Sequence, residues 1–195
     1  MTGAISRFPV PALSELPADI RANLQEMQDR AGFVPNGPRT YTHRPDEYRV
    51  FTAYRDTLML RASGLSKAEK EMIIVVTSAA NGCTYSVVAH GAMLRVYERN
   101  PRIADQLATN YLKAEITPRQ KAMLDFAMKV CGAAHTVGDD DFARLREHGW
   151  NDEDAWDIAA ITALYGMANR MASVTAMRAN DEFYLMGRVP RAPKA

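Results

Sequence analysis

The chain has 195 residues, enough for one domain with a substantial core and too few for two comfortable ones. Its 24 Lys and Arg residues against 23 Asp and Glu residues leave a formal charge of +1. No overall field therefore favours nucleic acid or an anionic membrane. Two cysteines are far too few for a secreted disulfide framework.

No stretch of about 18 uncharged apolar residues is present, and the N-terminus lacks the basic and apolar regions of a secretory signal. We therefore expect a cytoplasmic protein whose partners include neither a membrane nor a nucleic acid.

The first half of the chain predicts helices separated by strong breakers. Prolines within residues 1–16 predict an extended N-terminal arm, since proline fixes φ and removes a donor. A helix is expected over 17–31, ended by Gly32. A loop dense in proline and glycine follows over 33–38, and a second helix over 45–64.

The third expected helix, over 66–80, carries Glu71. Ser66 and Glu69 form a capping box at its start. Its middle is apolar all round, and the β-branched run 73–76 alone would also suit a strand. The capping box and the length of the segment favour a buried helix, and the next helix is expected over 83–98.

The second half predicts helices over 100–109, 117–132, 139–149 and 151–170, each opened by Asn, Thr or Asp as a cap. The expected fold is an all-α single domain of about eight helices.

The expected domain covers residues 17–186, with the arm 1–16 before it and a tail over 187–195 after it. No repeat, coiled-coil heptad or low-complexity tract interrupts it.

One segment gathers the chemically versatile side chains. Cys83, Ser86 and His90 fall on one side of a helix, because positions three, four and seven apart share a face. Cys83 follows the helix-opening pair Asn81-Gly82, so the positive end of the helix dipole would favour its thiolate. A thiolate beside a histidine is the arrangement that thiol nucleophiles need.

Glu71, on the preceding helix, is expected to hydrogen-bond one nitrogen of the His90 imidazole and leave the other free to take a proton. A structural core histidine and a solvated first-turn carboxylate are the alternative interpretations of these two residues. A packed, inert thiol is the alternative for Cys83.

This segment resembles the active-site signature of the alkylhydroperoxidase D and carboxymuconolactone decarboxylase superfamily. That signature is a Glu, a mostly apolar stretch, Cys-x-x-Cys, and a His four residues beyond the second Cys. The matching positions are Glu71, Cys83, Ser86 and His90. The residues that fit the branch called peroxidase-related enzymes are Asn81, Tyr85 and Ala89. The resemblance extends over about 16–178 and implies an alkylhydroperoxidase D-like fold, with Asn81 and Tyr85 at the substrate pocket.

One position departs from the family pattern. In the resembling peroxidases the second cysteine is oxidised to sulfenic acid, the first resolves it as a disulfide, and His and Glu help to deprotonate the attacking thiol. The resemblance thus implies that Cys83 is the resolving thiol and that Ser86 stands in the peroxidatic position. A serine forms neither a sulfenic acid nor a disulfide, so the two-cysteine cycle cannot run within this motif.

Three functions stay open. The favoured one is an antioxidant peroxidase in which Cys83 reduces hydroperoxides and is reduced by an external thiol or by Cys131. The second is a decarboxylase-like, non-redox enzyme with His90 as base and Glu71 as its orienting acid; a serine nucleophile at Ser86 is a variant of it. The third is an inactive scaffold of the same fold. An introduced serine at position 86 is a further interpretation of the sequence alone.

No metal or cofactor is expected. No two of the four histidines have the i, i+4 spacing of a zinc helix, and no Gly-rich phosphate loop or dinucleotide fingerprint is present. Cys131 is expected to be a packed core thiol. His135 lies in an expected loop, where it lines the pocket or is solvated, and His43 and His148 lie at helix ends.

The resemblance also implies trimers or hexamers. The apolar 66–80 helix and a methionine-rich face near Met167 and Met171 favour burial between subunits, and the arm over 7–17 suits crossing onto a neighbour. We expect a homo-oligomer, and a hexamer in particular.

Overall fold

A computed structural model describes residues 4–188 of the chain. Within these residues the secondary structure is entirely helical, with no β-strand. The α-helices are α1 (Ala18–Ala31), α2 (Asn36–Tyr41), α3 (Pro45–Leu60), α4 (Lys67–Ala80), α5 (Thr84–Glu98), α6 (Ile103–Asn110), α7 (Pro118–Ala133), α8 (Asp139–Glu147), α9 (Asp152–Val174) and α10 (Asp181–Leu185). Short 3-10 turns are η1 (Leu13–Glu15), η2 (Tyr111–Lys113) and η3 (Ala134–Thr136). The prediction of an all-α fold is confirmed.

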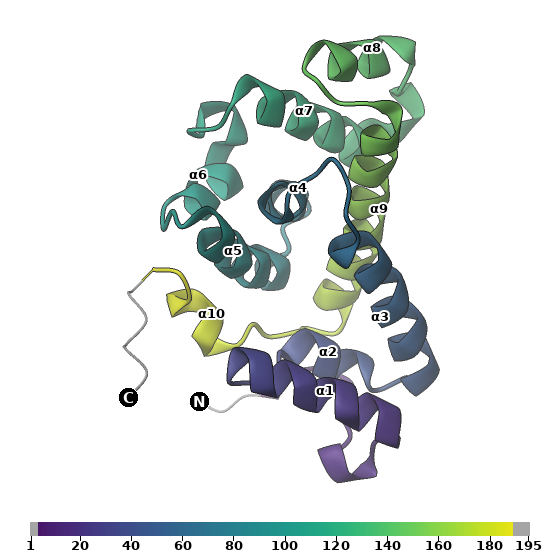
Figure 1. The fold of residues 1–195 in the computed structure, drawn as a ribbon. Coiled ribbons are helices and arrows are strands. Elements are labelled where there is room, and N and C mark those ends of the chain that lie inside the picture. Colours follow the sequence, from purple (N-terminus) through teal and green to yellow (C-terminus); the bar gives the residue numbers. More distant parts are fainter. Residues whose placement is uncertain (1–3, 189–195) are drawn as a thin grey trace.

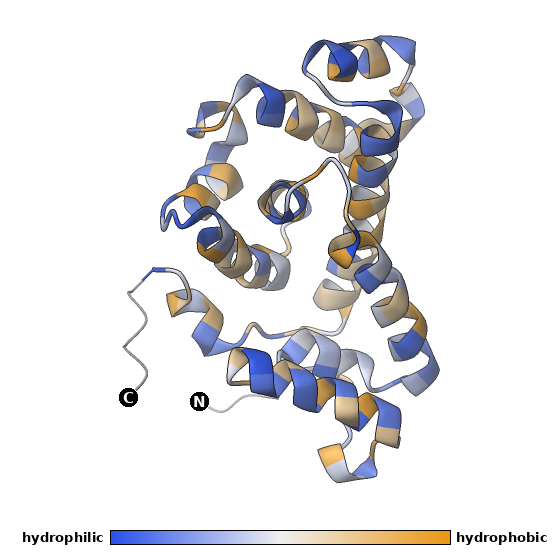
Figure 2. Ribbon diagram, viewed as in Figure 1, coloured by the Kyte–Doolittle hydropathy of each residue, from blue (hydrophilic) through white to orange (hydrophobic). Residues whose placement is uncertain are grey.

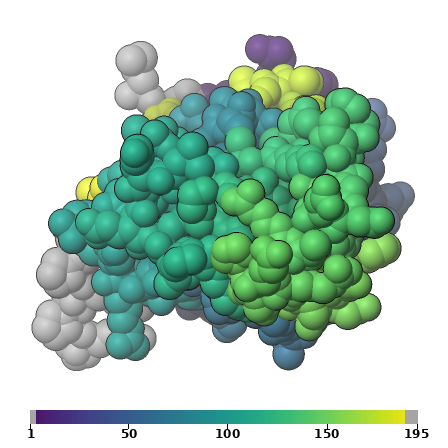
Figure 3. Space-filling model, turned by 90° about the horizontal axis from the view of Figure 1, so that it is seen from above, coloured from purple at the N-terminus to yellow at the C-terminus, as the bar shows by residue number. Residues whose placement is uncertain are grey.

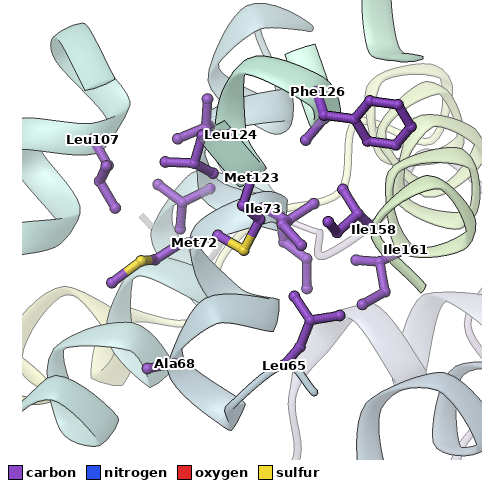
Figure 4. Packing of buried hydrophobic residues seen from close by; sticks show 14 of the residues in the cluster. Leu65, Ala68, Met72, Ile73, Leu107, Met123, Leu124, Phe126, Ile158 and Ile161 are labelled. Carbon is purple, nitrogen blue, oxygen red and sulfur yellow. The ribbon is translucent and has the colours of Figure 1, made fainter. Parts of the chain in front are cut away.

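Helix α4 is the centre of the main bundle. Figure 1 shows it end-on, surrounded by α5, α6, α7 and α9, which all contact it. Side chains 72–76 are at most 3% exposed, and Figure 4 shows Ile73 of α4 meeting Met123 of α7 and Ile158 of α9. Each such buried side chain contributes about 1.5–3 kcal/mol. The prediction of a helix buried on all sides is confirmed.

The start of α4 has the predicted capping box. Ser66 Oγ accepts a hydrogen bond from the Glu69 N–H at 3.1 Å, and the Glu69 carboxylate accepts one from the Ser66 N–H at 2.8 Å. This reciprocal pair satisfies two backbone donors that the first turn leaves free. It fixes the start of the helix that carries Glu71.

A second layer lies across one end of the bundle. Helices α1, α2 and α3 form it at the bottom of Figure 1, and α3 contacts α9. Figure 2 shows hydrophilic and hydrophobic residues alternating along α1 and α3, as expected for helices with one exposed face. Helix α10 packs on α5 beside this layer. At the opposite end, seen from above in Figure 3, side chains of the α6–α8 region cover the core.

The described part of the N-terminal arm lies against its own chain. The Arg7 N–H donates to the Thr175 carbonyl at 2.6 Å, and the Arg178 N–H donates to the Ile5 carbonyl at 3.1 Å. These bonds fix the start of the arm to its own chain, and the crossing of residues 7–17 onto a neighbouring subunit stays a prediction. Residues 1–3 and most of the expected 187–195 tail lie outside the described residues.

Two short helices, α2 and α10, were not expected from the sequence. Helix α2 begins after Pro35 and contains Pro38 in its first turn, a position that proline tolerates because the N–H there has no intrahelical partner. We expected a loop over 33–38 because of Pro35 and Pro38, but these two prolines lie at the start of a helix. Helix α6 starts at Ile103 rather than at 100, because Asn100 Oδ1 accepts from the Arg102 N–H and closes a turn first.

None of the described helices is both long and apolar enough to cross a membrane.

Candidate active site

The turn between α4 and α5 sets the position of the motif. Gly82 has a φ of +64°, in the left-handed region that glycine adopts without strain. The Cys83 N–H then donates to the Ser78 carbonyl at 2.9 Å, and Cys83 is the N-cap residue of α5. The chain reverses within three residues, so α5 packs back along α4.

This reversal brings Glu71 of α4 against His90 of α5. The Glu71 Oε2 and His90 Nδ1 atoms are 2.7 Å apart, and their side chains are 7% and 19% exposed. The His90 ring also meets the edge of Tyr165 at a centroid distance of 4.7 Å and an angle of 83°. The carboxylate thus holds one imidazole nitrogen and leaves Nε2 as the group that can exchange a proton.

Cys83 and Ser86 form a second pair. The Cys83 thiol donates to Ser86 Oγ at 3.4 Å, and both residues are 3% exposed. Ser86 precedes His90 by four residues on the same helix, so the two side chains share a face. The structure therefore pairs the thiol with the hydroxyl and the imidazole with the carboxylate, and the spacing along α5 puts Ser86 and His90 on one face.

A cavity of about 1410 Å³ lies against these groups. It opens to solvent on one side, is lined by residues of the N-terminal helices and of α4, α5, α9 and α10, and has mainly apolar walls. Ser86, Glu71 and His90 line it, whereas Cys83 lies behind Ser86, packed against Ala172 and Met177. The serine hydroxyl rather than the thiol is the motif group next to the cavity.

Two tyrosines of the cavity wall also pack against Cys83. Tyr85 accepts a hydrogen bond on its hydroxyl from the Gly37 N–H at 2.8 Å, and burial raises its pKa. Tyr41 stacks on Phe51 at 4.3 Å with 7° between the rings. Burial raises the pKa of Tyr41 to about 12, and its buried hydroxyl has no hydrogen-bond partner among the described residues.

Several residues singled out from the sequence lie away from this cavity. Asn81 is exposed and accepts a weak hydrogen bond from Cys131 Sγ at 3.7 Å, so it does not line the cavity as expected for a substrate-pocket residue. Cys131 is partly exposed rather than packed in the core, because its position on α7 faces the end of α4. Both cysteines are free thiols.

The other histidines have local roles. His135 is exposed on η3 and does not line the cavity. His43 Nδ1 lies 3.1 Å from the Pro9 carbonyl, and His148 Nδ1 lies 2.9 Å from the Arg144 carbonyl. Within residues 4–188 no three His, Cys, Asp or Glu side chains cluster as a metal site would require.

Sequence reasoning missed the part of the cavity that comes from outside the motif. Tyr41 and Arg55 belong to α2 and α3, and Tyr165 belongs to α9. None of them stands at a spacing that relates it to Cys83 or His90, so only the tertiary fold could identify them. Asn169 ties α9 to α4, because its Oδ1 accepts from Ser78 Oγ at 3.1 Å. Arg170 is exposed and donates to the Gly166 carbonyl of its own helix.

Known proteins are similar to this chain in both fold and sequence. A family model for the carboxymuconolactone decarboxylase family matches residues 45–129. The chain is 64% identical to an uncharacterized peroxidase-related protein from Ralstonia eutropha JMP134, described as an alkylhydroperoxidase AhpD core, with a TM-score of 0.96 over 97% of this chain and 100% of that one. A peroxidase-related protein from Silicibacter sp. TM1040 is 39% identical, with a TM-score of 0.91 over 95% and 97% of the two chains.

A debrominase in complex with 2,3,4-tribromopyrrole has the same fold at 20% identity, with a TM-score of 0.75 over 95% of this chain and 96% of that one. No curated protein matches the chain. These likenesses define an all-α protein of the alkylhydroperoxidase D-like class. The chain belongs to the alkylhydroperoxidase D-like and carboxymuconolactone decarboxylase superfamily.

Proposed function

We propose that this protein is a one-cysteine, thiol-dependent peroxidase that reduces organic hydroperoxides. The observation that carries the proposal is a pair of contacts: Cys83, behind the cavity wall, lies 3.4 Å from Ser86, and His90 lies 2.7 Å from Glu71, while Ser86, His90 and Glu71 line the cavity. This arrangement gives the thiol proton a path to a base. No metal or bound cofactor takes part in the proposed reaction.

The first step activates the thiol. Cys83 passes its proton to Ser86 Oγ, and the hydroxyl proton of Ser86 moves on to His90, one helical turn away. Glu71 stabilises the imidazolium that forms. The negative charge that remains on Cys83 lies at the N-terminus of α5, where Cys83 is the N-cap residue.

The second step transfers oxygen. The thiolate attacks the terminal peroxide oxygen, so an S–O bond forms as the O–O bond breaks. The departing alkoxide takes the proton back from His90 and leaves as the alcohol. Cys83 is oxidised to sulfenic acid while the hydroperoxide is reduced.

An external thiol must complete the cycle. A first thiol attacks the Cys83 sulfenic acid, releases water and forms a mixed disulfide; a second thiol then releases Cys83 as the free thiol and leaves as part of an external disulfide. Ser86 cannot form a disulfide. Cys131 bonds to Asn81 and Thr77 on the other side of the turn and does not line the cavity, which favours an external reductant over an internal one.

Steady-state turnover tests the proposal. We expect the wild-type protein to reduce cumene hydroperoxide with dithiothreitol as the electron donor, and Cys83→Ser to lose this activity. Cys131→Ser, which removes the other thiol, is the matched control and should retain it. Turnover that survives Cys83→Ser would sink the assignment of Cys83.

A second candidate function rests on Ser86, the motif group that lines the cavity. In a non-redox enzyme His90 would act as general base and Glu71 would orient it. The Ser86→Cys variant separates the two functions. If the peroxidase assignment is correct, the restored cysteine pair should raise hydroperoxide turnover; a variant and wild type that are both inert toward hydroperoxide would favour the non-redox enzyme.

A further inference from the structure

We propose that the cavity binds amphipathic carboxylic acids, with the apolar body against the aromatic and methionine wall and the carboxylate on Arg55. This inference rests on the proposed peroxidase function and names its substrate class: hydroperoxides of such acids. Binding of the acid itself needs no reactive thiol, so it can be tested separately.

The size of the cavity argues for a large ligand. Its volume of about 1410 Å³ exceeds the roughly 300–1,000 Å³ that is typical of sites for drug-sized molecules. A small alkyl hydroperoxide would leave most of the wall without contacts, and unfilled apolar space forfeits dispersion energy. The site therefore suits a ligand with a long or bulky apolar part.

The chemistry of the wall agrees with its size. Aromatic rings form much of it, from Phe33, Tyr41, Phe51, Tyr85, Tyr165 and Phe183. Methionines fill the spaces between them, from Met27, Met59, Met93, Met177 and Met186. Methionine is flexible and polarizable, so it adapts to apolar chains of differing shape. These residues provide binding energy for an apolar body and few polar groups to hold a hydrophilic one.

Arg55 is the cation that can bind a ligand from inside this wall. It lies one turn after Phe51 on α3, and its side chain is 22% exposed. Its Nε and Nη2 both bond to one oxygen of the adjacent Asp56, at 2.9 and 2.7 Å. Nη1 makes no hydrogen bond to any residue of the described chain, so one edge of the guanidinium is available for a carboxylate.

The pair with Asp56 does not cancel this capacity. Asp56 is 37% exposed, and solvent screening makes an ion pair at that exposure weak. Both bonds also converge on a single carboxylate oxygen, which leaves the two-pronged geometry of the guanidinium unused.

Arg55 lines the same cavity as Ser86 and His90. Burial raises the pKa of Tyr85 and of Tyr165, and the charge of Arg55 opposes the rise at both hydroxyls. Tyr165 in turn contacts the His90 ring. An acid held on Arg55 would therefore lie along the wall that contains His90.

The other cations of the wall are engaged or peripheral. Arg95 is buried and donates to the Phe183 and Met186 carbonyls, at 2.7 and 2.9 Å. Arg188 pairs with Asp105 through two bonds. The remaining cations are exposed: Arg30, Lys67 and Arg99. Among the carboxylates that line the cavity, Glu71 is already paired with His90.

Paired ligands of equal chain length test the proposal by calorimetric titration of the reduced, full-length protein. We expect octanoate to bind about tenfold or more tightly than octan-1-ol, since the charged, two-pronged hydrogen bond that only the carboxylate can make is stronger than a neutral one. Arg55→Met should abolish the preference by weakening octanoate binding alone. Arg30→Met, which removes an exposed cation of the same cavity, is the matched control and should keep it.

Equal affinities for the acid and the alcohol in the wild type would overturn the proposal, as would a preference that survives Arg55→Met or an absence of binding by either ligand. If Arg55→Met does not fold, Arg55→Lys serves instead: it keeps the charge, loses the planar fork, and should give a reduced preference. Octanoate binding without hydroperoxide turnover would count against the peroxidase and leave this binding site intact.

Discussion

Ser86 separates the only motif thiol from the imidazole that would accept its proton. Because the Cys83–Ser86 contact is 3.4 Å and His90 follows one turn later, the hydroxyl can act as a bridge instead of a reactant. Ser86→Ala should therefore slow Cys83 oxidation without removing the thiol. The rate is measured by mass spectrometry under limiting hydroperoxide. If Cys83 is oxidised at the wild-type rate in this variant, Ser86 does not carry its proton.

Glu71→Gln removes the charge beside His90 while keeping the shape of the side chain. General acid–base catalysis contributes about 10²–10⁴-fold, and the carboxylate stabilises the charged imidazole, so we expect hydroperoxide turnover to fall by about 10²-fold or more. Glu182→Gln, which changes an exposed carboxylate of the same cavity, is the control. Unchanged turnover in Glu71→Gln would contradict the relay.

Tyr41→Phe tests the unpartnered hydroxyl of the cavity wall. A buried hydroxyl without a hydrogen bond costs about 1–3 kcal/mol, whereas the stacking on Phe51 is retained by phenylalanine. We expect the free energy of unfolding in urea to rise by about 1 kcal/mol. A loss of stability would show that the hydroxyl has a partner in solution, such as an ordered water.

At the scale of residues, the sequence predicted which site residues are close along the chain, but not which residues distant along the chain complete the site. Helical spacing placed Cys83, Ser86 and His90 on one face, and the family signature added Glu71. It could not show that Ser86 rather than Cys83 lines the cavity, because that depends on which way α9 and the C-terminal segment cover the turn. Asn81 was misplaced for a related reason: its side chain points toward α7.

At the scale of elements, the contact between α2 and α5 leaves no room for a larger side chain at Gly37. A Cβ on Gly37 would collide with the Tyr85 hydroxyl, which is the end of a rigid ring. Gly37→Ala must therefore displace Tyr85 and break the bond from the Gly37 N–H. Such strain typically costs about 1–3 kcal/mol.

We expect Gly37→Ala to lower the urea midpoint and to weaken octanoate binding together, since Tyr85 belongs to the cavity wall. Gly132→Ala, at a glycine with open space around it, is the control and should do neither. An unchanged midpoint in Gly37→Ala would mean that α2 can shift away without cost.

Long helices with clear caps were predictable, and short ones were not. The capping boxes at Ser66, Thr117 and Asn151 mark α4, α7 and α9 within one or two residues of their starts. Helices α2 and α10 have six and five residues, too few for a periodic apolar pattern. Tertiary contacts stabilise them, such as the bonds from Asn36 and Asn180 that join the segments before each helix.

For the whole molecule, buried tyrosines predict a loss of stability in alkaline solution. Burial is the main cause that raises the pKa of Tyr41 and of Tyr111 to about 12, above the usual value near 10. The unfolded chain therefore releases these protons first. The stabilisation is complete below pH about 10 and is lost as the pH rises toward 12.

Urea midpoints between pH 9 and 11 check this sign. We expect the midpoint of the wild type to fall more steeply with pH than that of Tyr41→Phe, which lacks one of these groups. Tyr54→Phe, at an exposed tyrosine, is the control. Parallel slopes for wild type and Tyr41→Phe would contradict the assigned burial effect.

The prediction of a homo-oligomer rests on the exterior of the molecule, because α4, whose apolar middle was expected to favour burial between subunits, is buried within this one. Large apolar side chains are exposed on α3 and α9, including Val50 at 72% and Trp156 at 70%. Exposed apolar surface of this kind is typical of contacts between proteins. We expect a hexamer of 21.7 kDa subunits by light scattering at micromolar concentration; a homogeneous species of one subunit mass would refute assembly.

The central claim is that Cys83 is the thiol that reacts with peroxide. The most direct measurement treats the reduced protein with one equivalent of cumene hydroperoxide in the presence of dimedone, which traps sulfenic acids, and maps the adduct by peptide mass spectrometry. Cys131 in the same chain is the internal reference. The account predicts an adduct on Cys83 that forms well before any on Cys131, and that is lost in His90→Ala. An unmodified Cys83, or an adduct confined to Cys131, would contradict it.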